Sequence, residues 1–537
     1  MRKPYLKPAA LFLAGLLLLP AGSSFAAEEL KKTDASVTAD LFDQVAYEEG
    51  VQFLRLGNLF RKITFSKSAA RDVNIFDEVP DSLFFTNRHG RNRLPAEELQ
   101  KGASDPAPGK GRWTVTEGQV EGTNPGFFIK DAETGRDFFL GFDSIDTPEL
   151  TTAAESISAR VFHAAGYNVP AYHVVKFKSE DLEVAPSAAF YDNTGFKNQL
   201  TKEKIEELLL FVPREDDGSF RASVRTLPQG KDLGPFDFDR RRKGDPEDLL
   251  PHHYLRSIRG LRVLASWVNH YELRNGNTLD VLEKADGKDV VRHYLIDFKS
   301  TLGSASHGLK SPQMGHEYVF DFGEFFKALF SFGFWEKPWQ KRWDENDRNP
   351  GLPGVGYFDN RQFNPGRWKS ELPYHAFKNL TAADAYWAAK LVMSFTDGDI
   401  SALVETGKLT DEAAKKTLVE TLIQRRDLIG RYWFEKSCSL ENFEAAGYTI
   451  RAEDWMLTHH LTQSPRRYRY CVCKSGLRGT SDKPEFILNS QDIARLPDSF
   501  TLSIRAQKAD GKWGKRVCLS LKKQDGGLAI AGIKREL

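Results

Sequence analysis

An acid, an amide and a second acid at short intervals are the residues best suited to catalysis in this sequence. Glu272 and Asn277 lie five residues apart on a loop that begins at His270, and Asp297 follows twenty residues later at the end of a hydrophobic strand. A loop carboxylate can orient an attacking hydroxyl, while an amide oxygen and a carboxylate can hold the divalent cation that bridges phosphates. Each residue alone is more typical of an ordinary turn or helix cap. Their order and spacing together indicate phosphoryl transfer.

Two features upstream could belong to the same site. Gly122 and Gly126 lie in a glycine-spaced turn between two expected strands, where the backbone can approach a phosphate closely. A plain hairpin turn explains this spacing equally well. Glu155 is a carboxylate within a helix of small and apolar residues, and a solvated or capping carboxylate is its ordinary interpretation. The role of both features depends on what folds around them.

Hydrophobic patterns predict the elements that must position these residues. Residues 132–135 join two strands in a hairpin signal, and a helix then starts after Thr147 and stops at Gly166. A second helix precedes the loop, and a hairpin separates the loop from Asp297. The expected strands are residues 112–117, 127–131, 137–143, 172–178, 277–283 and 290–298, and the expected helices are residues 148–166, 254–270, 384–395 and 411–433.

The order of a glycine turn, a hairpin, a carboxylate-bearing helix, a His-x-acid-Leu-x-x-x-Asn loop and an Asp-Phe strand resembles the protein-kinase signature set. The Ile-Asp-Phe strand end and the Arg-Asn-Gly-Asn loop are most similar to the atypical branch that contains phosphatidylinositol kinases, HipA-type kinases and secretory-pathway kinases. The similarity covers about residues 112–303, and the whole chain also resembles a group of large exported bacterial proteins. It implies an α+β fold with a two-lobed kinase-like domain over residues 112–435.

The resemblance also implies a role for each candidate residue. Asn277 and Asp297 become ligands of Mg²⁺ or Mn²⁺, and Glu272 takes the position of the catalytic acid. Glu155 becomes the carboxylate of an ion pair. ATP is the implied nucleotide, and the residues implied to contact it are Gly122, Gly126, Lys130 and Glu155.

Three positions depart from the kinase pattern. Gly141 stands where the phosphate-binding lysine is expected, Glu272 replaces the usual aspartate, and Lys299 replaces the glycine of Asp-Phe-Gly. Glycine supplies neither charge nor reach, and moving a catalytic group by about 1 Å can cost on the order of a hundredfold in rate. These departures favour a degenerate kinase, or pseudokinase, that binds a ligand or partner. The alternative is an active phosphotransferase that uses Glu272 as its acid and Lys130 or Lys299 as its lysine.

The N-terminus has the composition of a secretory signal peptide. Three basic residues precede an apolar run over residues 9–19, and small residues lead to a cleavage point after Ala26. Residues 1–26 are therefore expected to be removed on export to the periplasm or the cell exterior. Helices and an extended segment are expected over residues 27–111, and no segment of the mature chain is apolar enough to span a membrane.

Period-two alternation begins near residue 465 and predicts a β-sandwich-like module over residues 436–537. Four cysteines allow three disulfide pairings, and the sequence leaves the pairing open. Cys471 and Cys473 should share one face of a strand, each within reach of Cys518 on a neighbouring strand. The cysteines of the chain are Cys438, Cys471, Cys473 and Cys518. This module supports a third hypothesis, a protein that binds a cell-envelope ligand or carbohydrate.

Composition and charge exclude several classes of protein. Of the 537 residues, 40% are hydrophobic and 28% are charged, which excludes a collagen-like chain, a wholly disordered chain and a polytopic membrane protein. The 75 Lys and Arg nearly balance the 74 Asp and Glu, so nucleic acid is not expected as a partner. Serine hydrolase, zincin and P-loop motifs are also absent from the sequence.

Overall fold

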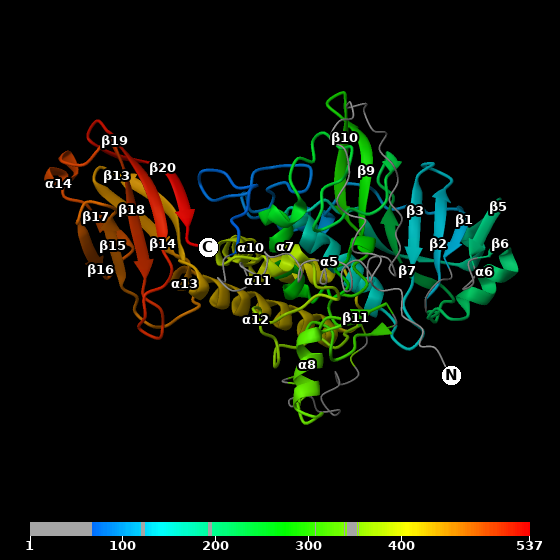
Figure 1. Ribbon diagram of the computed structural model, residues 1–537. Helices are drawn as coiled ribbons and strands as arrows, with labels where there is room; N and C mark the ends of the chain where they lie inside the picture. The colour runs from blue at the N-terminus through cyan, green and yellow to red at the C-terminus, as the bar shows by residue number, and fades with distance from the viewer. Residues whose placement is uncertain are drawn as a thin grey trace, which may run out of the picture.

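The computed structural model describes residues 67–119, 124–191, 196–306, 308–337, 339–340, 352 and 354–537 of the chain. The expected signal peptide, Gly122 and the first forty residues of the 27–111 region lie outside the described residues. The described chain is α+β and has three successive parts. A sheet lies at one end, helices occupy the middle, and a β-rich module lies at the other end (Figure 1).

The first part is a seven-stranded sheet with the strand order β4-β7-β3-β2-β1-β5-β6. Its strands are β1 (Trp113–Gln119), β2 (Gly126–Asp131), β3 (Asp137–Gly141), β4 (Tyr172–Phe177), β5 (Leu182–Tyr191), β6 (Lys197–Gln199) and β7 (Phe220–Thr226). Neighbouring strands are antiparallel except β1 and β5, which are parallel. Alternate apolar residues of the strands build a core to which helix α6 (Lys202–Leu209) contributes Ile205 and Leu209.

Helix α5 (Leu150–Ala165) packs against β4 and β7 and carries Glu155. The Asp143 carboxylate accepts hydrogen bonds from two backbone N–H groups in the first turn, at 2.7 and 2.8 Å, and so caps the helix. Gly166 ends the helix with a φ of 127°, and a Cβ there would lie 2.4 Å from the Phe85 ring. The cap and the glycine therefore set where the helix begins and ends, and with it the position of Glu155.

The middle part is helical and shares one large hydrophobic core with α5. Its helices are α4 (Ala96–Lys101), α7 (Arg256–Val268), α9 (His375–Lys378), α10 (Ala382–Met393), α11 (Asp397–Glu405) and α12 (Glu412–Lys436). Trp267 of α7 and Trp387 of α10 are buried in this core. The two helices approach closely at Gly260, where a Cβ would lie 2.7 Å from the Trp387 ring.

A hairpin connects the Glu272 loop to Asp297. Strands β9 (Thr278–Ala285) and β10 (Lys288–Leu295) pair antiparallel, and β8 (Lys231–Asp232) adds to β9. A shorter hairpin, β11 (Ser304–Ala305) with β12 (Gly308–Leu309), follows Asp297. Because a hairpin returns the chain to its starting point, Asp297 lies beside the loop that precedes β9.

The C-terminal module consists of two sheets over one core. Its strands are β13 (Leu440–Ala446), β14 (Thr449–Asp454) and β17 (Glu485–Ile487) in one sheet, and β15 (Tyr468–Val472), β16 (Arg478–Ser481), β18 (Ser499–Ala506), β19 (Val517–Gln524) and β20 (Gly527–Arg535) in the other; its helices are α13 (Trp455–Thr458) and α14 (Ser490–Ala494).

Cys471 and Cys473 are both exposed and Cys438 is buried, and all four cysteines are free. Strand β18 lies between β15 and β19, so the expectation that Cys518 occupies a strand next to Cys471 is wrong. Which strands lie side by side depends on the tertiary fold, and the alternation of apolar and polar residues within one strand does not determine it.

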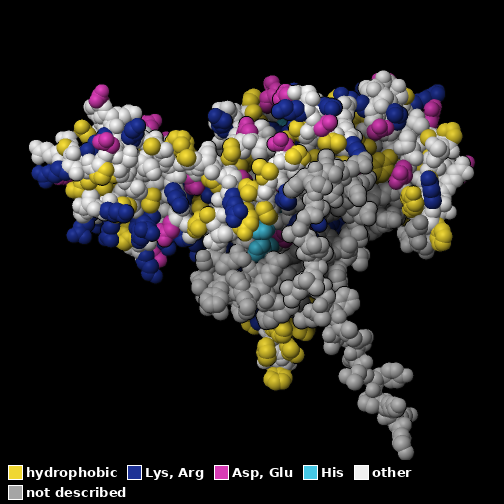
Figure 2. Space-filling view, turned by 45° about the horizontal axis from the view of Figure 1, so that its top comes forward, with side chains coloured by type: hydrophobic (Ala, Val, Ile, Leu, Met, Phe, Trp, Pro, Cys, Tyr) yellow, Lys and Arg dark blue, Asp and Glu magenta, His cyan; other side chains and the backbone are white. Residues whose placement is uncertain are grey.

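Helix α8 (Phe322–Phe330) projects from the middle part (Figure 1). Exposed apolar side chains gather on this projection (Figure 2), and Phe332 and Phe334 beyond the helix end are 91% and 90% exposed. Among the helices that the structure describes, none combines the length and the apolarity that crossing a bilayer requires.

The α+β class predicted from the sequence is confirmed, and the arrangement is consistent with a kinase-like domain followed by a sheet-rich module. The helix expected at residues 148–166 is α5, and the hairpin expected at residues 277–298 is β9 with β10. The elements β5, β6, α6 and β7 were not predicted from the patterns. Neither β5 nor β7 alternates between buried and exposed positions, since β7 is buried at almost every residue, and β6 has only three residues.

Candidate functional site

The loop that carries Glu272 is anchored through its first residues. Helix α7 ends at Asn269, whose φ of 55° turns the chain into the loop. The His270 ring is buried 5.4 Å from the Phe298 ring and 5.8 Å from the Phe162 ring, measured between ring centroids. Burial lowers the pKa of His270 to about 4, so the ring is neutral at physiological pH. The aromatic contacts tie the loop both to α5 and to the segment that carries Asp297.

Glu272 is a buried carboxylate held by two neighbours. The Ser306 hydroxyl lies 3.0 and 2.8 Å from its two carboxylate oxygens and can donate to either. The Arg274 guanidinium lies 3.7 Å from Glu272 and 3.2 Å from Glu371. These contacts fix the orientation of the Glu272 side chain and offset the cost of burying its charge.

Asn277 is joined through its backbone to Ile296, the residue before Asp297. Its side-chain amide donates to the Glu272 carbonyl oxygen at 2.8 Å, which orients the amide oxygen away from that carbonyl. Its own carbonyl accepts a hydrogen bond from the Ile296 N–H at 3.0 Å. The Glu272 loop and the end of β10 are therefore joined through the backbone next to Asp297.

Asp297 has a left-handed backbone with a φ of 61°. Its N–H donates to the Tyr172 hydroxyl at 3.0 Å, and its carboxylate accepts the Lys299 N–H at 3.1 Å. Burial alone would raise the pKa of Asp297, but the positive charges of Lys299, Arg225 and Arg274 hold it below its usual value. The carboxylate is therefore ionised in a strained backbone position of the kind that clusters at functional sites.

Glu155 and Lys299 share the space in front of Gly141. A Cβ placed on Gly141 would lie 3.5 Å from a Glu155 carboxylate oxygen and 3.7 Å from Lys299 Cε. Burial raises the pKa of Glu155 to about 7, although the Lys299 charge opposes that shift. The Lys299 ammonium also lies 5.5 Å from the centre of the Phe139 ring. A lysine thus reaches the position that the strand itself leaves without a side chain.

Lys130 and Gly126 lie on β2 but at opposite ends. Gly126 pairs with Gly141, and Lys130 pairs with Asp137 four residues further along the strands. That distance is about 13 Å at 3.3 Å per residue. Lys130 is about half exposed and lies 3.8 Å from the Asp137 carboxylate. The structure therefore brings Gly126 close to the Glu155 and Lys299 pair and places Lys130 away from it.

Several residues of this site were not singled out in the sequence. Arg225 of β7 lies 5.2 Å from the Phe139 ring centre, and its charge acts on both Glu155 and Asp297. No local pattern marks Arg225, because only the sheet order places β7 next to β3. Ser306 likewise has no signal of its own, while Arg274 could have been noticed within the Glu272 loop.

The residues present fit a divalent cation of the magnesium type. Asn277 offers an amide oxygen and Asp297 an ionised carboxylate, which are the hard oxygen ligands that Mg²⁺ prefers. In the described part of the chain, no group of three or more His, Cys, Asp or Glu side chains could hold a metal ion. Mg²⁺ needs no such group where one or two protein ligands act together with substrate phosphates.

Comparisons with known proteins give little further information. No protein-family model matches the chain, and no curated protein matches it. Among solved structures, the crystal structure of the Helicobacter pylori proinflammatory kinase CtkA is similar at 10% sequence identity with a TM-score of 0.30. The match covers 62% of this chain and 99% of the CtkA chain. At this identity and TM-score, the similarity is too weak to indicate a function for this chain.

Proposed function

We propose that this protein binds a nucleoside triphosphate with Mg²⁺ or Mn²⁺ and transfers its terminal phosphoryl group, with Lys299 as the lysine that Gly141 cannot supply. The observation that carries the proposal is the shared space in front of Gly141, which Lys299 and Glu155 approach from two other segments. A positive charge at this point can contact the phosphates of a nucleotide, and a neighbouring carboxylate can orient that charge.

Each remaining residue has a defined task under this proposal. Asn277 and Asp297 would hold the cation, which supplies charge neutralisation at the phosphates. Glu272 would orient the acceptor hydroxyl and accept its proton. Ser306 can donate its single hydroxyl proton to only one Glu272 oxygen at a time, so the carboxylate keeps lone pairs that can accept the acceptor hydroxyl. Phosphoryl transfer depends chiefly on positioning and charge stabilisation, and the buried loop contacts provide the positioning.

A degenerate kinase that binds a partner without phosphotransfer is the second candidate. Two observations favour it. The Phe139 ring is so close to the backbone of Gly126 that a Cβ there would lie 2.5 Å from it, which narrows the space over the strands. The Ser306 hydroxyl also hydrogen-bonds to the Glu272 carboxylate, which is the group that phosphoryl transfer would require.

A thermal-shift experiment with transfer assays tests the proposal. The full chain is melted with ATP, with and without Mg²⁺ or Mn²⁺, in the parent protein, Lys299→Met and the matched control Lys130→Met. Ligand at 100 times its dissociation constant stabilises by about 2.7 kcal/mol. We expect a metal-dependent rise in Tm in the parent and in Lys130→Met, and none in Lys299→Met. No rise in a cooperatively melting parent would contradict nucleotide binding.

A lysine exchange makes the test sharper. The neighbours of a Cβ on Gly141 all lie at ordinary contact distances of 3.5 Å or more, so the double variant Gly141→Lys with Lys299→Gly has room for the new side chain. We expect it to recover the metal-dependent shift that Lys299→Met loses. Glu272→Gln should keep the shift and lose transfer to an acceptor. If the parent shows the shift but no transfer under any condition, the degenerate kinase is the correct function.

Export stays a prediction from the sequence, and it bears on the nucleotide. ATP is scarce outside the cytoplasm, so an exported enzyme needs an unusual phosphoryl donor or a different task. The thermal-shift series should therefore include other phosphoryl donors beside ATP.

A further inference from the structure

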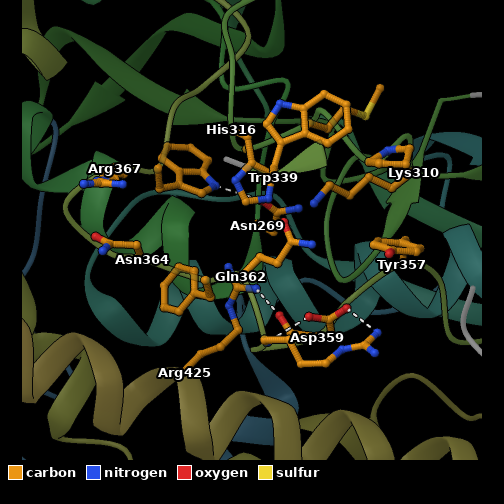
Figure 3. A pocket seen from close by; sticks show the side chains of 16 residues that line it. Asn269, Lys310, His316, Trp339, Tyr357, Asp359, Gln362, Asn364, Arg367 and Arg425 are labelled. Atoms are coloured by element: carbon orange, nitrogen blue, oxygen red, sulfur yellow. Dashed lines mark hydrogen bonds and ion pairs between the residues drawn. The ribbon is translucent and has the colours of Figure 1, made fainter. Parts of the chain in front are cut away.

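The middle part contains a cavity of about 330 Å³. Asn269, which directly precedes the Glu272 loop, lines one wall of it. Its walls come from the end of α7, from α12, and from the segments 310–316 and 357–368. Figure 3 shows Lys310, His316, Gln362 and Arg425 around this space, from different segments of the chain. The residues that line the cavity do not include Glu155, Glu272, Asn277, Asp297 or Lys299. It is therefore separate from the site discussed above.

The charges around the cavity are mostly positive. Four Lys and Arg side chains line it, and Asp359 is the sole acidic residue among the described lining residues. Asp359 already pairs with Arg361 at 3.2 Å. The four basic residues are Lys310, Arg361, Arg367 and Arg425. Among the described lining residues, positive charge therefore exceeds negative charge, which favours an anionic ligand.

Arg425 is the most deeply buried of these cations, at 4% exposure. Two of its guanidinium nitrogens donate to the carbonyl oxygens of Asp359 and Ser266, at 3.1 and 2.5 Å. Its Nε is buried without a hydrogen-bond partner among the described residues, and its guanidinium stacks 3.7 Å from the centre of the Phe363 ring. Burial lowers the pKa of Arg425 to about 9, which leaves it charged at neutral pH.

Asn269 provides a second unsatisfied donor at the cavity wall. Its side-chain oxygen accepts the Trp368 indole N–H at 2.7 Å, which fixes the direction of the amide. The remaining Nδ2 group is buried, with no hydrogen-bond partner in the part of the chain that the structure describes. A buried donor without a partner is energetically costly, so a ligand that accepts a hydrogen bond from it is favoured.

Lys310 completes the set of groups that an anion would contact. Burial, with the nearby Arg425 charge, lowers the pKa of Lys310 to about 7, while Asp359 opposes that shift. The pKa of His316 falls to about 4 through burial, with Lys310 and Arg425 adding to the effect, so its ring is neutral. The other charged groups facing Lys310 and His316 are Arg361 and Arg367 at the rim and Lys369 behind His316. A bound anion would offset the free-energy cost of burying the charged Lys310 ammonium.

We propose that this cavity binds a small organic molecule through a compact oxyanion, a phosphate or a carboxylate, held by Lys310, Arg425 and Asn269. Aromatic rings of Tyr357 and Trp368 and the amide of Gln362 line the rest of the space for the organic part. A volume near 330 Å³ suits a metabolite-sized ligand. The proposal does not depend on phosphotransfer at the Asp297 site.

Calorimetric titration of the full chain tests the proposal with three probes: inorganic phosphate, sulfate and citrate, each against chloride at matched ionic strength. We expect saturable one-site binding of at least one probe below about 10 mM. Binding of phosphate and sulfate without citrate assigns the oxyanion as a phosphate, and the converse assigns a carboxylate. No saturable binding of any probe would overturn the proposal.

Variants of the cavity locate the binding. Lys310→Met should weaken the binding at least about tenfold. The control is Lys378→Met, which removes another lysine whose pKa burial lowers, to about 8, but which lies outside the cavity and is exposed at the surface. Lys310→Met removes a buried cation, so its Tm in chloride at pH 6 should equal or exceed that of the parent, which checks that it folds. Equal affinity in Lys310→Met and the parent would contradict the assigned site.

The pH dependence gives an independent readout. Sulfate keeps its charge between about pH 6 and pH 9, so a change in its affinity reports on the protein. In the parent, affinity should fall as the pH rises through 7, because Lys310 loses its proton. In Lys310→Met the affinity should no longer depend on pH in this range. A pH dependence that persists in the variant would show that another group controls binding.

Discussion

At the scale of single residues, the burial of charge is the main feature of the Asp297 site. Glu155 is buried and Asp297 is half-buried, and their pKa values move in opposite directions. Asp297 has Lys299 beside it in the same turn, whereas Glu155 is reached by that charge only from across the site. The pair therefore offers one ionised carboxylate and one that is close to its titration point at neutral pH.

Glu155→Gln should stabilise the ligand-free protein at high pH. The pKa of Glu155 is raised from 4.5 to about 7, so its charge destabilises the fold fully above about pH 7 and not at all below about pH 4.5. The free energy of unfolding of Glu155→Gln should exceed that of the parent by up to about 3 kcal/mol at pH 8, and the difference should fade toward pH 5. Urea unfolding at both pH values measures it. The exposed Glu183→Gln serves as control, and equal effects of the two variants would contradict the burial argument.

At the scale of elements, the end of α5 decides where Glu155 lies. Gly166→Ala should destabilise the protein by about 2–3 kcal/mol, because the new methyl group meets the Phe85 ring at 2.4 Å and the φ is positive. Gly135→Ala is the matched control, since Gly135 also has a positive φ of 67° but no atom within 4 Å of its Cβ. It should cost about 1 kcal/mol. Equal losses, measured by denaturant unfolding, would show that Phe85 does not restrict the helix end.

The α8 projection is an element whose apolar residues add little to folding. Phe332 and Phe334 are almost fully exposed, so changing both to Ser should leave Tm within about 1 °C, consistent with a change below 0.5 kcal/mol. The same change should reduce the binding of a hydrophobic dye, because an exposed apolar cluster is lost. Phe211→Ser, at another exposed phenylalanine, should reduce it less. A large fall in Tm would mean that these rings are covered in solution.

At the scale of the whole molecule, an ion cluster links the C-terminal module to the middle part. Arg535 of β20 lies 3.3 Å from Asp77 and 2.5 Å from Glu441, and Asp77 in turn lies 3.0 Å from Arg256 of α7. All four residues are buried. Removing one partner of such a cluster leaves an uncompensated buried charge.

Arg535→Met should therefore destabilise the chain by about 3–5 kcal/mol. Arg516→Met, which breaks a half-exposed pair with Glu536 at 3.2 Å, should cost about 1 kcal/mol or less. The Arg535 and Lys390 charges hold the pKa of Glu441 below its usual value although burial opposes them. The cluster thus stabilises the protein at neutral pH and weakens as acid protonates Glu441. The loss begins near the unfolded-state pKa of 4.5 and continues below it, so denaturant unfolding between about pH 5 and pH 3 should show a larger loss in the parent than in Arg535→Met.

Processing of the N-terminus is a prediction for the chain as a whole. N-terminal sequencing of protein expressed in a bacterium with a general secretory system should give Ala27 as the first residue. Replacing Ala26 by a bulky residue such as Phe should block cleavage and leave the chain longer. A first residue at Met1 in the fractionated protein would contradict export.

The sequence by itself determined helix α5, the loop that carries Glu272 and Asn277, and the hairpin that leads to Asp297. Helical and alternating patterns are local, and so are the spacings within one loop and one hairpin. For this reason α5 and β9 with β10 were predicted close to their observed bounds, and the C-terminal module was predicted to be β-rich.

Only the tertiary structure decided which lysine reaches the site. The sequence analysis named Lys130 as a nucleotide contact and Lys299 only as an alternative lysine, whereas the strand register places Lys130 at the far end of β2 and Lys299 lies in front of Gly141. Arg225 and Ser306 enter the site because β7 lies between β3 and β4 and because the chain after Asp297 folds back over the loop. The cavity around Lys310 joins residues more than a hundred positions apart. Long-range packing creates such groupings, and no short sequence pattern encodes them.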